Sequence, residues 1–275
     1  MRPGPLWGKK DKHCDPAQPA DQTLGSWWDH VLIDPESRLI VSLVVGRRTL
    51  ETALEAFLDF YARTDGALPG LITTDAYAAY CTVIVSTYGV RKEDMELTEA
   101  ERLEIDYEAL PPVYFPVEIA YATVHKERAQ GRVVRVEQRI VLGTAEQVAA
   151  VLAEGSTAPT INVNYVERWN GTQRHFNARK ARKVYTFSKD VLFHVAVTWL
   201  VVVAYNWCWT PRTLREQVQA RPRRYRQRTP AMVAGLTEEC WTLLQVLGYP
   251  VYRHDCQPKK SRKRRKRKAK RTEGG

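Results

Sequence analysis

The most apolar part of the sequence is residues 187–209 (FSKDVLFHVAVTWLVVVAYNWCW), and this segment restricts the fold more than any other. So many large apolar side chains must be removed from water, which favours a long buried helix, capped at its start by Ser188. The longest apolar stretch, residues 195–205, is too short to span a bilayer, and it contains a threonine. We therefore expect a soluble protein with no membrane partner.

Length and composition agree with a globular protein. The chain has 275 residues, of which 44% are hydrophobic and 27% charged, enough to bury the core of one large domain or two small ones. The five cysteines are scattered, odd in number and without a Cys-x-x-Cys pair, which argues against a disulfide framework and a structural zinc site. No secretory signal is recognisable after Met1, so we expect a cytoplasmic protein with reduced thiols.

The order of the predicted elements indicates an α/β fold. Strand-like and helix-like segments alternate along the chain, which is typical of helices packed on a mixed sheet. The predicted elements are a hairpin over 30–45, a helix from Leu50 capped by Thr49, a strand over 71–74, a second hairpin over 117–128 and 132–143, a helix with a Thr144–Gln147 capping box, and the buried helix over 187–209.

Positive charge is concentrated at the end of the chain. The net charge is +11, and residues 259–271 (KKSRKRRKRKAKR) contain eleven basic residues and no acidic one, so the rest of the chain is balanced. Such a run repels itself and buries no apolar area, so we expect a disordered arm that binds nucleic acid or another polyanion. A nuclear-localisation-like patch or a solubilising tail would have the same composition.

Charge is also unevenly distributed before the tail. Residues 168–183 carry six basic residues and no acid, and residues 212–228 carry seven arginines and one glutamate. Residues 93–108 carry eight acids and one arginine, which favours a solvated face or an insertion. The two basic blocks flank the apolar segment, so we expect positive charge beside a rigid core.

Asp75 is the first candidate for a functional carboxylate. It follows the short apolar strand over 71–74, and the carboxyl ends of strands are where open α/β sheets bind their ligands. Asp is also a good helix cap, so Asp75 capping the next helix is the simpler interpretation of the residue taken alone.

Glu167 is the second candidate, near the start of a predicted helix. At 100° per residue, Asn170 and Arg174 share its face, and an acid beside an arginine suits the binding of a metal ion and a phosphate. An ordinary amphipathic helix with a solvated polar face fits the same spacing. The aromatic residues of this segment lie on the opposite face: Tyr165, Trp169 and Phe176.

Three segments in this order resemble the transposases of the insertion-sequence-one type. They are ITTDAYAAY (72–80), NYVERWNGTQRH (164–175) and KVYTFSKD (183–190), and the resemblance covers roughly residues 5–210. It implies an RNase H-like fold, a mixed sheet flanked by helices, with an inserted β-hairpin in this chain. The long VERWNGTQRH match is the most specific of the three.

The resemblance implies metal-dependent DNA strand cleavage and strand transfer. Asp75 and Glu167 would be the second and third acids of a triad that holds two Mg²⁺ or Mn²⁺ ions, and the partners would be transposon-end and target double-stranded DNA, bound by a homo-oligomer in the nucleoid. The predicted DNA-binding residues are Asn170, Arg174 and His175 on the helix, and Lys259, Lys260, Arg262, Lys263, Arg264 and Arg265 in the tail.

One position departs from the family pattern. The family has its first acid in an Asp-Glu-x-Trp segment; here Trp7 matches the tryptophan and Gly4 stands where the aspartate is expected. We therefore expect DNA binding with impaired strand cleavage. A catalytically inactive DNA-binding remnant or regulator of the same element, and a nuclease acting on RNA–DNA hybrids, are the alternatives.

The domain boundaries follow from these segments. We expect an irregular segment over 1–26, an RNase H-like core over 27–210 with an insertion at about 88–160, a helical Arg- and Trp-containing module over 211–256, and a disordered basic tail over 257–275.

Overall fold

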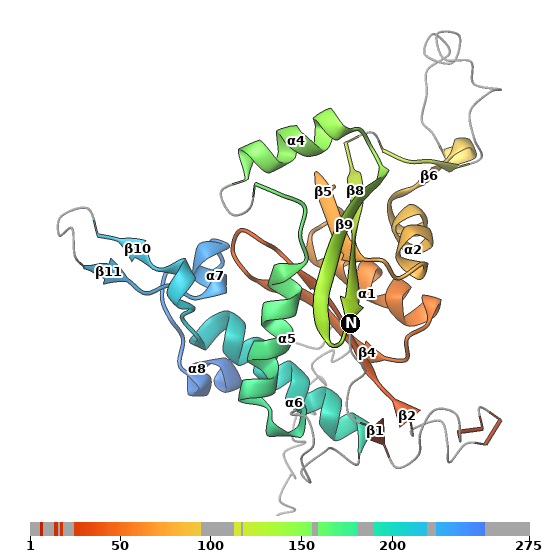
Figure 1. Cartoon of the computed structure of the whole chain (residues 1–275). Coiled ribbons are helices and arrows are strands. Elements are labelled where there is room, and N and C mark those ends of the chain that lie inside the picture. The colour runs from red at the N-terminus through yellow and green to blue at the C-terminus, as the bar shows by residue number, and fades with distance from the viewer. Residues whose placement is uncertain are drawn as a thin grey trace, which may run out of the picture.

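The structure is a computed structural model of the chain, and its elements are shown in Figure 1. It describes residues 6–7, 14–15, 17–18, 25–94, 113–116, 118–155, 159–180, 190–218 and 224–250. Within these residues the fold is mixed α/β, as the alternation of patterns predicts.

The first predicted hairpin is present. β3 (Trp28–Ile33) pairs antiparallel with β4 (Ile40–Gly46), with Ile33 opposite Ile40 at the turn. Asp34 stabilises the turn, because its carboxylate accepts hydrogen bonds from the backbone N–H groups of Glu36 and Ser37. Just before β3, the short strands β1 (Leu6–Trp7) and β2 (Gly25–Ser26) also pair antiparallel.

A second sheet has the order β5-β8-β9. β5 (Leu71–Asp75) is parallel to β8 (Ala120–Ala129), and β8 is antiparallel to β9 (Arg132–Leu142). The second hairpin is therefore part of this sheet, and the expectation that it is an insertion stays a prediction. Both faces of β8 are buried over its first residues, with Ala120, Ala122 and Val124 on one face and Tyr121 on the other.

Helices cover both faces of these strands (Figure 1). On one face, α1 (Leu50–Arg63) and α2 (Ala79–Tyr88) pack Phe57, Val83 and Ile84 against Tyr121 of β8. On the other face, α4 (Ala145–Glu154) packs Val148 against the neighbouring β8 residues Ala120, Ala122 and Val124. The side chains of β8 thus contact both helix layers in alternation.

α5 (Asn164–Phe176) and α6 (Val191–Val203) pack on the β3–β4 pair. Trp169 of α5 lies in a core with Leu43 of β4, Val202 of α6 and Tyr205 of the π-helical turn η6 (Ala204–Cys208). The predicted caps Thr49 and Thr144 are confirmed. The start of the apolar helix differs from prediction: Asp190 caps α6, and Ser188 lies outside the described residues.

The part after residue 210 is less helical than expected. Its described residues, 211–218 and 224–250, contain short elements only: the 3₁₀ turn η7 (Arg212–Leu214), the paired strands β10 (Glu216–Gln217) and β11 (Tyr225–Arg226), and the helices α7 (Pro230–Val233) and α8 (Leu243–Gly248). The other short elements are the paired strands β6 (Val90–Arg91) and β7 (Val113–Tyr114) and the 3₁₀ turns η3 (Lys92–Asp94) and η5 (Ala178–Lys180).

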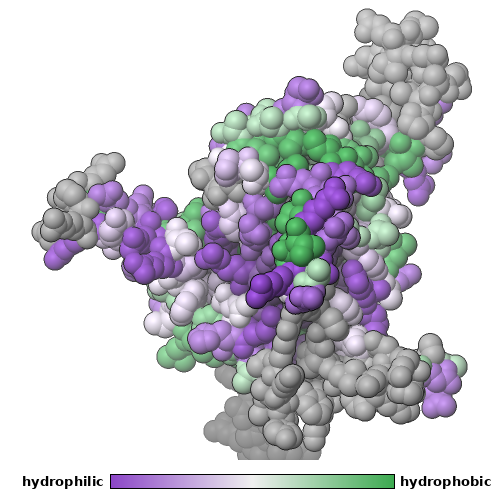
Figure 2. Space-filling view, in the orientation of Figure 1, coloured by the Kyte–Doolittle hydropathy of each residue, from purple (hydrophilic) through white to green (hydrophobic). Residues whose placement is uncertain are grey.

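The outer strand β9 exposes apolar as well as charged side chains. Val134 and Val136 are 61% and 51% exposed, and in the space-filling view apolar surface over β9 lies between hydrophilic residues (Figure 2). Charged neighbours of this kind limit edge-to-edge pairing of an exposed strand. β9 is therefore an edge of the sheet, and its arginines oppose pairing with another strand.

One helical stretch of the described chain, Val191–Leu214, has the length and hydropathy to cross a membrane. Its residues Thr198 and Val202 are buried, and Asn206 exchanges two hydrogen bonds with the backbone of Ile40, so the stretch contributes to the core of the fold. A single apolar helix with such packing is compatible with a soluble protein, as the sequence predicts.

Candidate functional site

Asp75 is the last residue of β5, at the carboxyl end of the strand, as predicted. The following helix α2 begins after Ala78, which has no side-chain cap, so Asp75 is not the cap of that helix. The simpler interpretation of Asp75 is thus wrong. Its side chain lines a cavity that Glu167 and Asn170 also line.

Glu167 lies in the first turn of α5, and a lysine holds its carboxylate. The Nζ of Lys126 on β8 lies 2.6 Å from Glu167 Oε2, close enough for a charge-assisted hydrogen bond. The Lys126 side chain is 19% exposed and that of Glu167 is 48% exposed. The carboxylate therefore remains accessible from solvent while the ion pair joins α5 to the sheet.

Two sets of contacts fix α5 in place. Trp169 is 1% exposed and its ring lies 4.8 Å from that of Tyr205. One helical turn later, the Gln173 side-chain amide donates to Asp29 Oδ2 at 2.8 Å and accepts from Lys180 Nζ at 2.8 Å. Asp29 on β3 is therefore a structural anchor for α5 and does not line the cavity.

The predicted DNA-binding residues of α5 are distributed over its exposed side. Asn170 lines the cavity beside Glu167, while Arg174 is half-buried and His175 is exposed in the last turn. Phe176 does not pack inward with Trp169 as expected; it is 42% exposed and its ring lies 4.9 Å from the ring of Trp209. The polar face predicted for α5 is confirmed, and its aromatic face is confirmed at Trp169.

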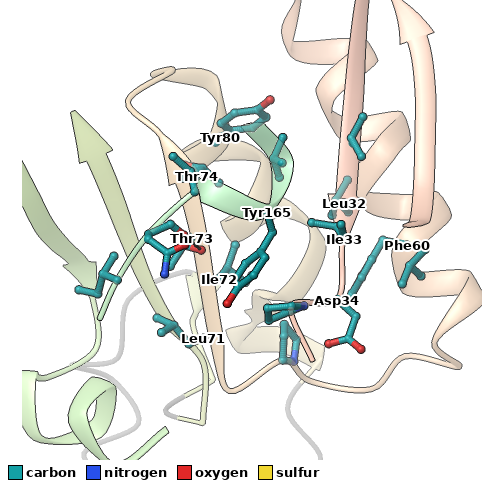
Figure 3. A pocket seen from close by; sticks show the side chains of 18 of the residues that line it. Leu32, Ile33, Asp34, Phe60, Leu71, Ile72, Thr73, Thr74, Tyr80 and Tyr165 are labelled. Atoms are coloured by element: carbon teal, nitrogen blue, oxygen red, sulfur yellow. Dashed lines mark hydrogen bonds between the residues drawn. The ribbon is translucent and has the colours of Figure 1, made fainter. Parts of the chain in front are cut away.

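The cavity itself has a volume of about 620 Å³ and lies between β3 and β5. Figure 3 shows Leu32 and Ile33 on one side of it, Leu71 and Ile72 on the other, and the ring of Tyr165 over the space between them. Its walls are mostly apolar, and the acidic residues that line it are Asp75 and Glu167 together with Asp34 and Glu36 of the β3–β4 turn.

The electrostatics around Asp75 keep its neighbours neutral. Burial lowers the pKa of His30, whose Nε2 donates to the backbone oxygen of Arg47 at 3.1 Å. Burial raises the pKa of the Tyr80 phenol, and the charge of Asp75 adds to the rise. Both side chains line the cavity beside Asp75, so the carboxylates are the acidic groups available there.

The metal ions implied by the resemblance need more ligands than this part of the structure supplies. Among the described residues there is no group of three or more His, Cys, Asp or Glu side chains that could hold a metal ion. Asp75 and Glu167 line one cavity, and Lys126 neutralises Glu167. These residues do not by themselves fit a centre for two ions.

Residues in other parts of the predicted site are not described. Gly4 and the tail residues from Lys259 to Arg265 lie outside the described residues, as does the acidic block from residue 95 onward. Their predicted roles remain predictions from the sequence.

Sequence reasoning missed two basic residues near this cavity. Lys126 was hidden because it lies in an alternating strand pattern, where nothing in the spacing pairs it with a residue 41 positions later. Arg48 follows β4, and its guanidinium lies 4.9 Å from the ring centroid of Trp28 and 4.3 Å from that of Tyr77. Its sequence neighbour Arg47 lies next to Trp27, and no local pattern pairs Arg48 with Trp28 or Tyr77, which are 20 and 29 positions away.

Comparisons of the chain with family models, with curated proteins and with solved structures found no match.

Proposed function

We propose that the chain is the catalytic portion of a DNA transposase of the insertion-sequence-one type, with impaired strand cleavage. The observation that supports this most is that Asp75, from a strand end, and Glu167, from the first turn of a helix, line one cavity although they are far apart in the sequence. Carboxylates from separate elements that line one cavity suit metal-dependent phosphodiester cleavage, in which they hold the ions. The RNase H-like fold is part of the same proposal.

The groups around the two carboxylates suit a polyanionic substrate. Arg174 and His175 extend along α5 away from Glu167, and Arg48 is held between two aromatic rings. Arginine at such positions binds phosphate oxygens through paired N–H groups. In this proposal α5 lies along the DNA backbone, and Asn170 contacts the phosphate nearest the carboxylates.

Mg²⁺ or Mn²⁺ belongs to the proposal as the cofactor, with at least one ligand from outside the described residues. A bound cation would neutralise the charge that develops on the phosphate. The pairing of Glu167 with Lys126, and the absence from the described residues of a group of three side chains that could hold a metal ion, support weak cleavage. They equally support the alternative, a DNA-binding remnant or regulator without catalytic activity.

A plasmid-nicking assay separates the two functions. Supercoiled plasmid is incubated with the chain and Mn²⁺, and with the Asp75→Asn and Asp59→Asn variants. Asp59 is a matched control because it is a partly exposed acid on α1 paired with Arg63. Slow nicking by the wild type and Asp59→Asn that is lost in Asp75→Asn supports the transposase.

Binding without nicking supports the remnant. Nicking that persists in Asp75→Asn, or no DNA binding by the wild type, contradicts the proposal. Preferential cleavage of an RNA–DNA hybrid would point to a hybrid nuclease instead.

A further inference from the structure

The strands β10 and β11 form a two-stranded ribbon, residues 215–218 and 224–228, that projects from the body of the fold beyond α7 (Figure 1). Residues 215–218 and 224–227 are all exposed, and the ribbon is hydrophilic surface in Figure 2. Val218 and Tyr225 are themselves 37% and 43% exposed. An isolated ribbon of two strands gains little stability from its own contacts, so its position must be fixed at its base.

The base of the ribbon is anchored in the fold. Leu214, just before the first strand, is 5% exposed, and Thr229, just after the second, is fully buried and caps α7. Arg228 Nε donates to the backbone oxygen of Leu214 at 2.9 Å, and Arg226 Nη2 donates to that of Glu238 at 2.6 Å. The ribbon therefore has a fixed direction although its strands bury almost nothing.

One face of the ribbon carries a row of arginines. Glu216 is opposite Arg226, and alternation along the second strand places Arg224 and Arg228 on the same face as Arg226. Alternate residues of a strand are roughly 6.6 Å apart, so the three guanidinium groups follow one another along that face. Glu216 pairs with Arg228 at the base, 3.6 Å away, which leaves Arg224 farthest from this acid along the strand.

The opposite face is positive as well. Gln217 is opposite Tyr225 there, and the guanidinium of Arg215 lies 4.1 Å from the ring centroid of Tyr225. A guanidinium stacked on a ring is held in orientation while the N–H groups at its edge stay able to donate. The described residues 212–218 and 224–228 contain five arginines and one glutamate, so positive charge surrounds the ribbon.

A projecting ribbon with arginines on both faces fits a partner that is negative on two sides. A flat acidic surface of a protein would contact one face and leave the other in water. The major groove of duplex DNA has phosphates along both walls, and its width of about 12 Å admits a two-stranded β-ribbon. Arginine binds phosphate oxygens and the guanine edge through paired N–H groups. Duplex DNA is therefore the partner that uses both faces.

We propose that the β10–β11 ribbon enters the major groove of duplex DNA, with Arg224 on one face and Arg215 on the other contacting the walls of the groove. None of the described residues of the ribbon lines the cavity that Asp75 and Glu167 share, so this is a second DNA-contacting surface. The inference rests on the proposed function for its partner, DNA, and does not depend on strand cleavage.

The first test measures the salt dependence of binding to a duplex of random sequence, with the full chain. Arg215→Gln with Arg224→Gln removes one charge from each face and leaves the arginines that anchor the base in place. Two lost contacts should flatten the salt slope by about 1.8, at about 0.9 per contact. The matched control is Arg132→Gln with Arg135→Gln, two exposed arginines of the hairpin strand β9, and should leave the slope unchanged.

A charge-conserving variant separates a lost contact from a damaged fold. Arg215→Lys with Arg224→Lys keeps both positive charges, so its salt slope should match that of the wild type, and melting temperatures should agree among all four proteins. If the wild type binds DNA but the Gln variant has the same slope, or the control flattens it equally, the ribbon proposal is overturned and the proposed function stands. A wild type that binds no DNA contradicts both.

The second test identifies the groove. Binding is compared on two duplexes of one sequence, of which one carries glucosylated 5-hydroxymethylcytosine, whose sugars fill the major groove because cytosine C5 lies there. The sugars should weaken binding of the wild type about tenfold and that of the Gln variant less, since a bidentate arginine contact accounts for about this factor. Equal affinity of the wild type for the two duplexes would place the ribbon outside the major groove and overturn the proposal.

Discussion

The ammonium group of Lys126 lies 2.6 Å from a carboxylate oxygen of Glu167, and this ion pair ties β8 to α5. This pair gives Glu167 a cation in the structure as it stands. Any divalent ion that uses this carboxylate must compete with a lysine that is already in place, since the two cations would share the same oxygen atoms.

Replacing Lys126 should therefore increase the affinity of the site for a divalent cation. Exposed and partly exposed pairs contribute about 0.2–1 kcal/mol, so Lys126→Met should tighten Mn²⁺ binding by a factor of about 1.4 to 5. Titration followed by electron paramagnetic resonance measures this. Arg128→Met, also on β8, is the control and should leave the affinity unchanged. Unchanged Mn²⁺ affinity in Lys126→Met would show that Glu167 is not a ligand.

The ion pair between Lys180 of η5 and Asp29 of β3 should be far more important for stability. The Lys180 side chain is 5% exposed, and its Nζ lies 2.7 Å from Asp29 Oδ2. Removing one partner of a buried pair costs about 3–5 kcal/mol, because the other charge is left in an apolar environment. We expect a loss of that size in the free energy of unfolding for Lys180→Ala, measured with urea.

Two variants sharpen that measurement. Arg63→Ala breaks an exposed pair with Asp59 and should cost less than about 1 kcal/mol. The double variant Asp29→Asn with Lys180→Met removes both charges and should recover most of the stability. A loss in the double variant as large as in the single one would mean that packing, and not the uncompensated charge, is responsible.

Stability should also decrease in mild acid because of His194. This histidine is 2% exposed on α6, and burial, together with the charge of Lys180, lowers its pKa to about 4, whereas Asp29 acts in the opposite direction. Between the unfolded pKa of about 6.5 and the folded pKa of about 4, the unfolded chain binds more protons, so stability falls as the pH falls.

The size of this effect is at most about 3 kcal/mol, lost between pH 6.5 and 4. The free energy of unfolding, measured at several pH values, should show a shallower acid slope in His194→Gln than in the wild type. His175→Gln is the control because His175 is exposed in the last turn of α5. Equal slopes in all three proteins would show that the pKa of His194 is the same in the folded and the unfolded chain.

Local patterns predicted most of the individual elements. The helix capped by Thr49, the strand that ends at Asp75 and the capping box at Thr144 follow from spacings within a few residues, and all three are confirmed. Long-range pairing could not be predicted in this way. The second hairpin joins the main sheet because β8 lies beside β5, and no local pattern indicates which strand is its neighbour.

The candidate site shows the same division. The helix periodicity correctly placed Trp169 in the core and Glu167 on the polar face of α5. It could not predict that Lys126 would contact Glu167, or that Asp29 and Lys180 would anchor the helix, because these contacts join residues 41 and 151 positions apart. The cavity arises from the relative position of β3 and β5, which depends on the packing of both helix layers.

The basic tail should contribute most of the salt dependence of DNA binding. Residues 259–271 carry eleven positive charges, while the preceding chain is balanced. Each phosphate that a basic side chain neutralises releases counterions, so the logarithm of the binding constant falls with the logarithm of the salt concentration by about 0.9 per contact. We expect removal of residues 259–271 to weaken binding to a duplex of random sequence and to flatten this slope by several units. Filter binding between 50 and 200 mM salt, roughly the range over which such contacts are weakened, measures it.

A tail in which the same basic residues are replaced by glutamine keeps the length and should behave like the deletion. If the slope is unchanged in both variants, the positive charges that contact DNA lie on the folded part of the chain, and Arg174 and Arg48 become the residues to replace next.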